Sequence, residues 1–194
     1  MARTKAFNEQ VVLEKATELF WRKGYHATTM DDLVKHLGIN RSSIYTTFGN
    51  KDALFTKALN HYLSSADDSD QSGIKDYANL EAYLRSFFKV IITDSIQDKQ
   101  HKGCFAVNCT TELAAHDEGI RQILLDNMDQ FVGKMTMIFA QQIQEGKLSK
   151  AKNPEALAQF MFSTMSSIKL ISRKTQDQQM LQNIADTAIW AIIL

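Results

Sequence analysis

Six side chains that can form hydrogen bonds or carry charge lie close together in this chain. Between Asn40 and Gly49 the sequence places one guanidinium, one phenol and four small hydroxyls, on Arg41, Ser42, Ser43, Tyr45, Thr46 and Thr47. An arginine can bond guanine through two N–H groups, and Ser and Thr can bond several base edges or phosphate oxygens. A Thr methyl group can also contact the methyl group of thymine. These residue types predict contacts to the major groove of duplex DNA.

The same stretch has the signals of a short helix over 41–48. Asn40 is a favoured N-cap residue, and Gly49 is suited to the helix end. Ile44 and Phe48 are four residues apart and share one face, so they can be buried while the polar residues point elsewhere. A helix this short is not stable alone in water, so other helices must hold it in place.

A second helix is predicted just before it, over 30–37. Thr29 and Asp32 have the spacing of a capping box, in which each side chain bonds the other residue's backbone N–H. Apolar residues then recur at helical spacing, at Met30, Leu33, Val34 and Leu37. Gly38 stands in the turn before Asn40. The two helices indicate a helix-turn-helix; the alternative, a small helical subdomain that only packs, does not explain the clustered hydroxyls.

Positive charge accompanies this motif. Lys51 follows the N-cap residue Asn50, and a lysine at a helix N-terminus favours a phosphate. Residues 1–60 hold nine Lys and Arg against six Asp and Glu, whereas the rest of the chain holds thirteen against sixteen. Although the net charge is zero, the N-terminal part is therefore basic and the rest of the chain acidic. This distribution is typical of a DNA-binding protein with a second function.

The whole chain of 194 residues is predicted to be all-α, because its apolar residues recur at helical spacing and no alternating strand pattern appears. We predict about nine helices, over 8–23, 30–37, 41–48, 51–65, 79–97, 104–115, 118–145, 154–172 and 177–192. A helix-turn-helix domain, 1–50, would precede a larger helical domain, 51–194. The polar segment 64–73 is predicted to be a mobile loop.

Several classes of protein are disfavoured. No apolar run approaches the roughly 18 residues of a membrane span, and the N-terminus lacks the apolar core of a signal peptide. Two cysteines do not make a disulfide framework, so a cytoplasmic protein is expected. No His shares a motif with Ser, Cys or Asp, so neither an enzyme nor a cofactor is expected.

Two histidines and two cysteines, His101, Cys104, Cys109 and His116, suggest a metal or redox site. On a helix, Cys104 and Cys109 would lie about 140° apart, and Cys109 and His116 about 10 Å apart along the axis. No metal site is therefore predicted. Cys104 stands at a predicted helix start, which lowers a thiol pKa, so it is a candidate sensor. A small buried cysteine is the alternative.

Residues 12–55 resemble the DNA-binding domain of the tetracycline-repressor (TetR) family of bacterial regulators. The matching residues are Ala16, Leu19, Phe20, Gly24, Tyr25, Thr28, Thr29, Met30, Asp31, Asp32, Gly38, Ile39, Ile44, Tyr45, Phe48, Asn50, Lys51, Leu54 and Phe55. Gly49 departs from the pattern, because many members have a charged or polar residue there. The resemblance implies a homodimer that binds a palindromic operator and represses a nearby gene.

The resemblance also implies roles for individual residues. Contacts to bases or adjacent phosphates would come from Arg41, Ser42, Ser43, Tyr45 and Thr46. Contacts to the DNA backbone would come from Thr28, Thr29, Tyr45 and Lys51. A small-molecule effector bound in the C-terminal domain would release the DNA, whereas a non-specific DNA-binding protein, which stays open as an alternative, would ignore effectors.

Candidates for lining the effector pocket are aromatic and Met residues, which would suit a flat or hydrophobic ligand. They are Tyr62, Tyr83, Phe87, Phe88, Phe105, Phe131, Met135 and Met165. At helical spacing the same residues equally fit an ordinary core. The helices predicted over 154–172 and 177–192 carry more apolar surface than one core face needs, which favours a homodimer through them. Burial within one chain is the alternative.

Overall fold

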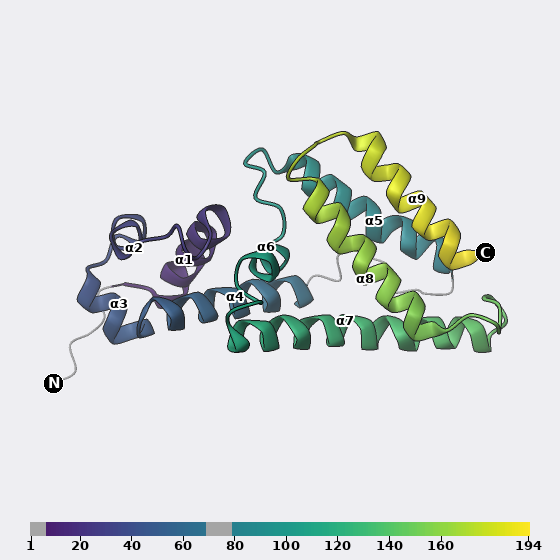
Figure 1. The fold of residues 1–194 in the computed structure, drawn as a ribbon, viewed down its shortest axis with the longest axis horizontal. Helices are drawn as coiled ribbons and strands as arrows, with labels where there is room; N and C mark the ends of the chain where they lie inside the picture. The colour runs from purple at the N-terminus through teal and green to yellow at the C-terminus, as the bar shows by residue number, and fades with distance from the viewer. Residues whose placement is uncertain (1–6, 69–78) are drawn as a thin grey trace.

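The computed structural model describes residues 7–68 and 79–194, and within these ranges it has nine α-helices and no strand. The helices are α1 (Glu9–Lys23), α2 (Met30–Leu37), α3 (Arg41–Phe48), α4 (Lys51–Asp68), α5 (Leu80–Gln97), α6 (Phe105–Glu112), α7 (Glu118–Gln144), α8 (Pro154–Ile171) and α9 (Gln178–Ile193). The predicted all-α fold class is confirmed. Helices α1, α2 and α3 form a small head at one end of an elongated molecule (Figure 1).

Two helices differ from their predicted ranges by more than one residue. Helix α4 continues to Asp68, so the first part of the predicted loop 64–73 is helical, and residues 69–73 lie outside the described residues. Helix α6 is shorter than 104–115. Cys104 is its N-cap residue with an extended backbone, and the chain leaves the helix at Leu113. A turn follows, and Asp117 then caps α7 by accepting a 2.9 Å hydrogen bond from the N–H of Ile120.

One apolar core joins the head to the helices that follow it. Its members in α1, α2 and α3 include Phe20, Leu33 and Ile44, which are fully buried. The same core includes Phe55 of α4 and Phe105 of α6. It therefore crosses the domain boundary predicted between residues 50 and 51, and α4 and α6 share the packing of the head as well as of the C-terminal part.

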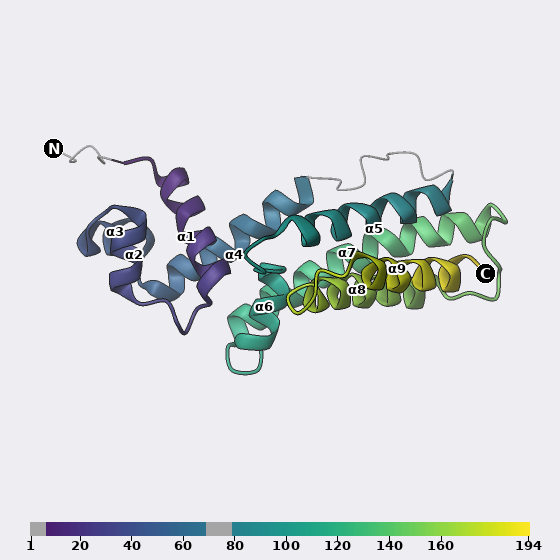
Figure 2. The same ribbon diagram turned by 90° about the horizontal axis from the view of Figure 1, so that it is seen from above.

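A second core lies between α5, α7, α8 and α9. Its largest fully buried side chains are Leu84, Phe88, Ile91, Met135 and Phe139. In the view from above, α8 and α9 lie along one side of this bundle and α5 along the other (Figure 2). Among the described residues this core has none in common with the first core, although α7 contributes to both, with Ile120 in the first and Met135 in the second.

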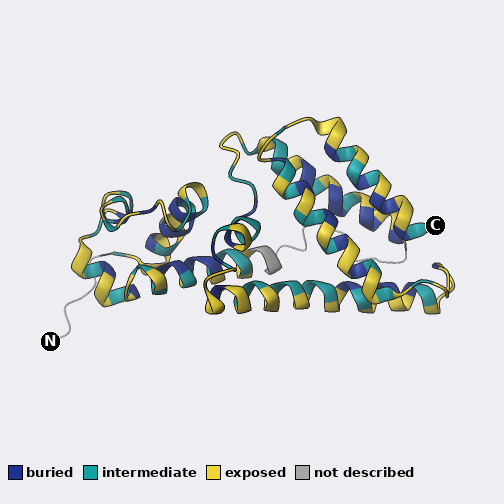
Figure 3. Cartoon of the chain, viewed as in Figure 1, coloured by how far each residue is buried: buried dark blue, intermediate teal, exposed yellow. Residues whose placement is uncertain are grey.

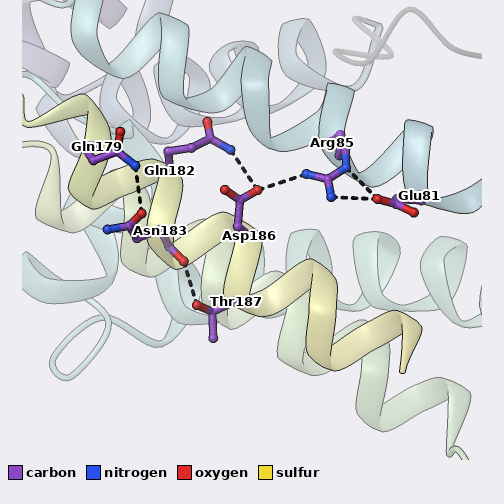
Figure 4. A network of polar contacts seen from close by, with 7 residues as sticks. All are labelled: Glu81, Arg85, Gln179, Gln182, Asn183, Asp186 and Thr187. Atoms are coloured by element: carbon purple, nitrogen blue, oxygen red, sulfur yellow. Dashed lines mark hydrogen bonds and ion pairs between the residues drawn. The ribbon is translucent and has the colours of Figure 1, made fainter.

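Helices α8 and α9 also carry exposed residues along their outer side (Figure 3). Large apolar side chains among them are Phe160, Leu170, Met180 and Trp190, which are between 41% and 65% exposed. At its other edge α9 is tied to α5, because Arg85 of α5 pairs with Glu81 at 2.7 Å and with Asp186 of α9 at 3.1 Å (Figure 4). The inner side of α9 is thus held within the chain while its outer side stays uncovered.

Candidate nucleic-acid interface

The capping box predicted at the start of α2 is present. The N–H of Asp32 donates to Thr29 Oγ1 at 3.1 Å, and the N–H of Thr29 donates to Asp32 Oδ2 at 2.8 Å. The ammonium of Lys23 lies 2.5 Å from the same carboxylate. Together with the bonds from Thr29, it holds the pKa of Asp32 well below its usual range. Helix α2 then ends at Gly38, whose left-handed backbone (φ 71°) starts the turn to α3.

Helix α3 buries its apolar face and presents its polar face to solvent. Asn40 caps the helix by accepting a 2.8 Å hydrogen bond from the N–H of Ser43. Ile44 and Phe48 are buried in the head, as their spacing predicts. Four of the predicted contact residues are exposed, namely Arg41, Ser42, Tyr45 and Thr46, and two are half-buried, namely Ser43 and Thr47. All six stand on one short helix, which is the element that a helix-turn-helix places in the major groove.

Arg41 has a partner within the head. Its guanidinium Nη2 lies 2.7 Å from Asp31 Oδ1 of α2, and both side chains are largely exposed. A pair of this kind contributes little stability, because water screens it. The pair therefore holds the guanidinium near the N-terminus of α3 but is weak enough for Arg41 to exchange Asp31 for another partner. The pairing with Asp31 was not predicted from the sequence.

Thr28 is the predicted DNA-backbone contact that the structure places away from the surface. Its side chain is fully buried, and its hydroxyl donates to the Gly24 carbonyl at 2.6 Å. A group with no exposed surface cannot reach a phosphate in this conformation, so the Thr28 hydroxyl packs inside the head instead. Thr29 is exposed and could reach the DNA backbone, although its hydroxyl also bonds the Asp32 carboxylate.

Lys51 belongs to a small cluster at the start of α4. Its ammonium lies 4.2 Å from the centroid of the Tyr25 ring, a cation–π contact. The Tyr25 hydroxyl donates a short hydrogen bond to Asp52, and this bond, together with burial, raises the pKa of Tyr25 to about 12. The N-cap residue Asn50 accepts from the N–H of Ala53 at 2.8 Å. The cluster fixes the position of the predicted phosphate-binding lysine against the turn that follows α1.

Glu112, the last residue of α6, holds that same turn from the other side. Its carboxylate accepts hydrogen bonds from the N–H groups of Tyr25 at 3.1 Å and of His26 at 2.8 Å. Gly24 lies directly beside it, with a backbone (φ 85°) that side chains rarely adopt. A Cβ on Gly24 would stand 2.9 Å from Glu112 Oε2. Sequence reasoning missed Glu112, because its partners are 86 and 87 residues away.

A cavity of about 320 Å³ lies between α4, α5, α6, α7 and α8, and most of the predicted pocket residues line it. Six of the eight candidates do so: Tyr62, Tyr83, Phe87, Phe131, Met135 and Met165. Its volume is at the lower end of the range of ligand pockets, about 300–1,000 Å³. Cys104 lines it too, and so do Lys134 and Lys169, which were not predicted.

Two of the predicted pocket residues lie elsewhere. Phe88 is fully buried in the core between α5, α7, α8 and α9. Phe105 is buried in the core of the head, where its ring lies 5.6 Å from the rings of Phe55 and Tyr62. Neither residue lines this cavity, because helical spacing shows which residues share a face but not which neighbour that face meets.

The two cysteines have different surroundings. Cys104 is buried at the wall of the cavity, where its Sγ accepts a 3.5 Å hydrogen bond from the Tyr62 hydroxyl. Cys109 lies in the core of the head, and burial raises its pKa above the usual range of a thiol. Among the described residues no group of His, Cys, Asp and Glu could hold a metal ion. Nor is any helix in the described ranges both long and apolar enough to cross a bilayer.

Comparison with protein families matches both parts of the chain. The family of bacterial regulatory proteins called tetR matches residues 12–58. The tetracyclin repressor-like C-terminal domain matches residues 81–188. The first match contains the helix-turn-helix, and the second contains most of the helices that surround the cavity.

Similar proteins span nearly the whole chain. The uncharacterized HTH-type transcriptional regulator YezE of Bacillus subtilis (strain 168) is 26% identical over 190 residues, which are 97% of this chain and 98% of YezE. The HTH-type transcriptional repressor ComR of Escherichia coli (strain K12) is 26% identical over 188 residues, which are 96% of this chain and 90% of ComR.

Solved structures share the fold over the same length. A cysteine mutant of the TetR family regulator CifR, complexed with 26-base-pair operator DNA, superposes with a TM-score of 0.83 at 22% identity and covers 98% of this chain and 99% of its own. A TetR family regulator from Cytophaga hutchinsonii has a TM-score of 0.79 at 18% identity, with 97% and 96% covered. The family consists of transcriptional regulators and not of enzymes, as the sequence led us to expect. This chain belongs to the TetR family of bacterial regulatory proteins and is a DNA-binding transcriptional regulator.

Proposed function

We propose that the protein is a repressor that binds a palindromic operator as a homodimer and leaves it when a small-molecule effector occupies the C-terminal domain. The observation that carries the proposal is the exposed polar face of α3, whose apolar face is buried in the head. The name of ComR, a repressor, supports the direction of control, and the operator complex of the CifR mutant supports the kind of DNA.

Contacts to the operator come from two groups of residues in this proposal. Those to bases and adjacent phosphates come from Arg41, Ser42, Ser43, Tyr45, Thr46 and Thr47. Those to the DNA backbone come from Thr29, Tyr45 and Lys51. Arg41 exchanges Asp31 for a base or a phosphate on binding, at little cost because the Arg41–Asp31 pair is exposed.

The outer sides of α8 and α9 form the proposed dimer interface. A groove of about 710 Å³ runs between the two helices, with Phe160, Met180 and Ile184 among the residues that line it. Polar residues share the groove, among them Gln179 and Asn183, which bond each other on α9 (Figure 4). An apolar centre with a polar rim is typical of protein interfaces. A two-fold symmetric dimer would present two α3 helices to the two halves of a palindrome.

Helix α6 is the element that can carry a signal from the cavity to the head. At its start, Cys104, Ala106 and Val107 line the cavity. At its end, Glu112 holds the turn between α1 and α2 through the N–H groups of Tyr25 and His26. An effector that moves α6 therefore moves that turn, and with it the orientation of the helix-turn-helix. Because the head also packs on Phe105, the movement cannot be confined to the C-terminal part.

Cys104 remains a candidate sensor thiol within this proposal, because it lines the cavity that an effector would enter. An effector with an electrophilic C=C bond would then form a C–S bond to Cys104 as that double bond opens, with the thiol proton taken up at the other carbon, and so move the start of α6. Alkylation by a maleimide tests this role. If it leaves operator binding unchanged, the sensor role is excluded, and a Cys104→Ser variant shows whether any loss depends on this thiol.

Footprinting of the DNA upstream of the gene, followed by a screen for small molecules that release it, tests the proposed function. At about 0.15 M salt, the full chain should protect a palindromic site and prefer it to random duplex. Equal binding to random duplex, without response to any compound, would favour the non-specific DNA-binding protein instead. Protection of a site that no compound releases would support the DNA-binding half of the proposal and contradict effector control.

A further inference from the structure

The cavity of 320 Å³ is lined by positive but not by negative side chains. Lys134 of α7 and Lys169 of α8 stand among its lining residues, and none of the described Asp and Glu residues does. A neighbouring cavity of about 600 Å³ differs, because Asp94 and Asp98 line it together with lysines. Of these two cavities, only the smaller one has lysines but no carboxylate among its described lining residues.

Lys169 lies at the wall between the two cavities, since it lines both of them, as do Tyr62 and Cys104. Its side chain is half-buried. Among the ion pairs of the described residues, none includes Lys169. An ammonium that has lost part of its hydration without gaining a carboxylate partner is stabilised by an anion that enters the cavity.

Tyr62 provides a hydrogen-bond donor at the same wall. Its hydroxyl donates to Cys104 Sγ at 3.5 Å, and a thiol sulfur is a weak acceptor. Burial raises the pKa of Tyr62 well above its usual value, so the phenol keeps its proton. An anionic oxygen would be a stronger acceptor for this O–H group than the thiol.

The rest of the lining is apolar and partly flat. The rings of Phe87 and Phe131 lie 5.9 Å apart, and that of Phe131 lies 5.6 Å from that of Phe162. All three line the cavity, as does Met165. Its volume equals that of about ten water molecules in the liquid, so it fits a compound with one or two rings.

We propose that the effector is a small aromatic or otherwise flat organic anion, whose acidic group binds Lys169 and Tyr62 while its apolar body lies against Phe87, Phe131 and Met165. Lys134 is exposed and therefore stands where the cavity meets solvent, so its charge attracts anions toward the cavity. The inference rests on the proposed function, to which it adds the chemical class of the effector.

Matched pairs of compounds test the inference by isothermal titration calorimetry on the full chain. The pairs are benzoate with benzamide and 2-naphthoate with 2-naphthamide, which differ in charge and hardly in shape. We expect at least one acid to bind about tenfold more tightly than its amide. Lys169→Met should remove most of this difference by weakening the acid alone. The control Lys89→Met changes an exposed lysine of α5 outside the cavity and should leave the difference intact.

Three results would overturn the inference: amides that bind as tightly as their acids, no binding by any acid, or a preference for acids that survives in a Lys134→Met/Lys169→Met double variant. The comparison of acid with amide needs no variant, so it stands even if a substitution impairs folding. Operator release is measured separately. If acids bind as expected but leave the operator complex intact, effector control fails and the anion site stands. If only neutral compounds release the DNA, effector control stands and the anion site fails.

Discussion

The carboxylate of Glu112 accepts a 2.8 Å hydrogen bond from the backbone N–H of His26, although 86 residues separate the two. The contact joins the end of α6 to the turn that leads into α2. Because the start of α6 lines the cavity, the two ends of one eight-residue helix touch the proposed effector site and the DNA-binding head. This short distance along one rigid element is the physical basis of the proposed coupling.

Removal of the Glu112 carboxylate should therefore weaken the head and its response to effectors. Glu112→Ala leaves the N–H groups of Tyr25 and His26 without their acceptor, which costs about 1–3 kcal/mol of the free energy of unfolding. Glu112→Gln keeps one acceptor oxygen and should lose less. Urea denaturation and operator titration measure the two effects. The control is Glu14→Ala, at an exposed position on α1; an equal loss there would contradict the role of Glu112.

A side chain at position 24 should be harmful for two separate reasons. Gly24 has φ 85°, and an added Cβ would stand 2.9 Å from Glu112 Oε2. We expect Gly24→Ala to lower the free energy of unfolding by about 1–3 kcal/mol. The matched control is Gly133→Ala in the interior of α7, where nothing lies within 4 Å of the added Cβ. That change should be stabilising by about 0.5–1 kcal/mol. Thermal or urea denaturation of both variants measures the two changes in the free energy of unfolding. A Gly24→Ala variant as stable as Gly133→Ala would contradict this prediction.

The stability of the head should depend on Tyr25 in alkaline solution. The hydrogen bond to Asp52, with burial, raises the pKa of Tyr25 from its usual value of 10.0 to about 12. The stabilisation is fully present below pH 10, and it is lost as the pH rises toward 12, because the unfolded chain loses the phenol proton first. Tyr25→Phe should lack this component. Urea denaturation of both proteins between pH 9 and about 11.5 measures it; parallel losses of stability would show that Tyr25 contributes nothing.

Charge placed on the outer side of α8 or α9 should separate the subunits. Phe160 and Met180 line the groove between these helices and are 43% and 45% exposed. Phe160→Glu and Met180→Glu should shift the chain toward monomer in sedimentation velocity and weaken operator binding, while the fold persists. Met137 of α7 is 69% exposed and lies outside the groove, so Met137→Glu is the control. A dimer that tolerates both charges, or one that only Met137→Glu dissociates, places the interface elsewhere.

Local signals in the sequence were enough to predict the helices. Thr29 and Asp32 form the predicted capping box, Gly38 ends α2, and Pro154 opens α8. These signals act between residues that are close in the chain, so spacing and residue type are sufficient. The polar face of α3 followed for the same reason, because Ile44 and Phe48 determine which face is buried.

Contacts between distant residues could not be predicted in this way. Phe105 and Phe88 fit a pocket by their spacing, but the helices that face them belong to the two cores. Thr28 matches a family motif, yet its hydroxyl bonds the Gly24 carbonyl. Glu112 and Lys169 depend on partners or neighbours in other helices, and a single sequence contains no record of that proximity. What the sequence left open was which side chains meet across the fold.

The most direct test of the account compares Arg41→Ala with Lys51→Ala on the operator and on variants of it. If Arg41 contacts a base, Arg41→Ala should weaken the free energy of operator binding by about 1–3 kcal/mol and relax the base preference at one position in each half-site. If Lys51 contacts a phosphate, Lys51→Ala should weaken all sequences alike and reduce the salt slope by about one. Titrations at several salt concentrations measure both. An unchanged sequence preference in Arg41→Ala together with an unchanged salt slope in Lys51→Ala would contradict the proposed operator contacts.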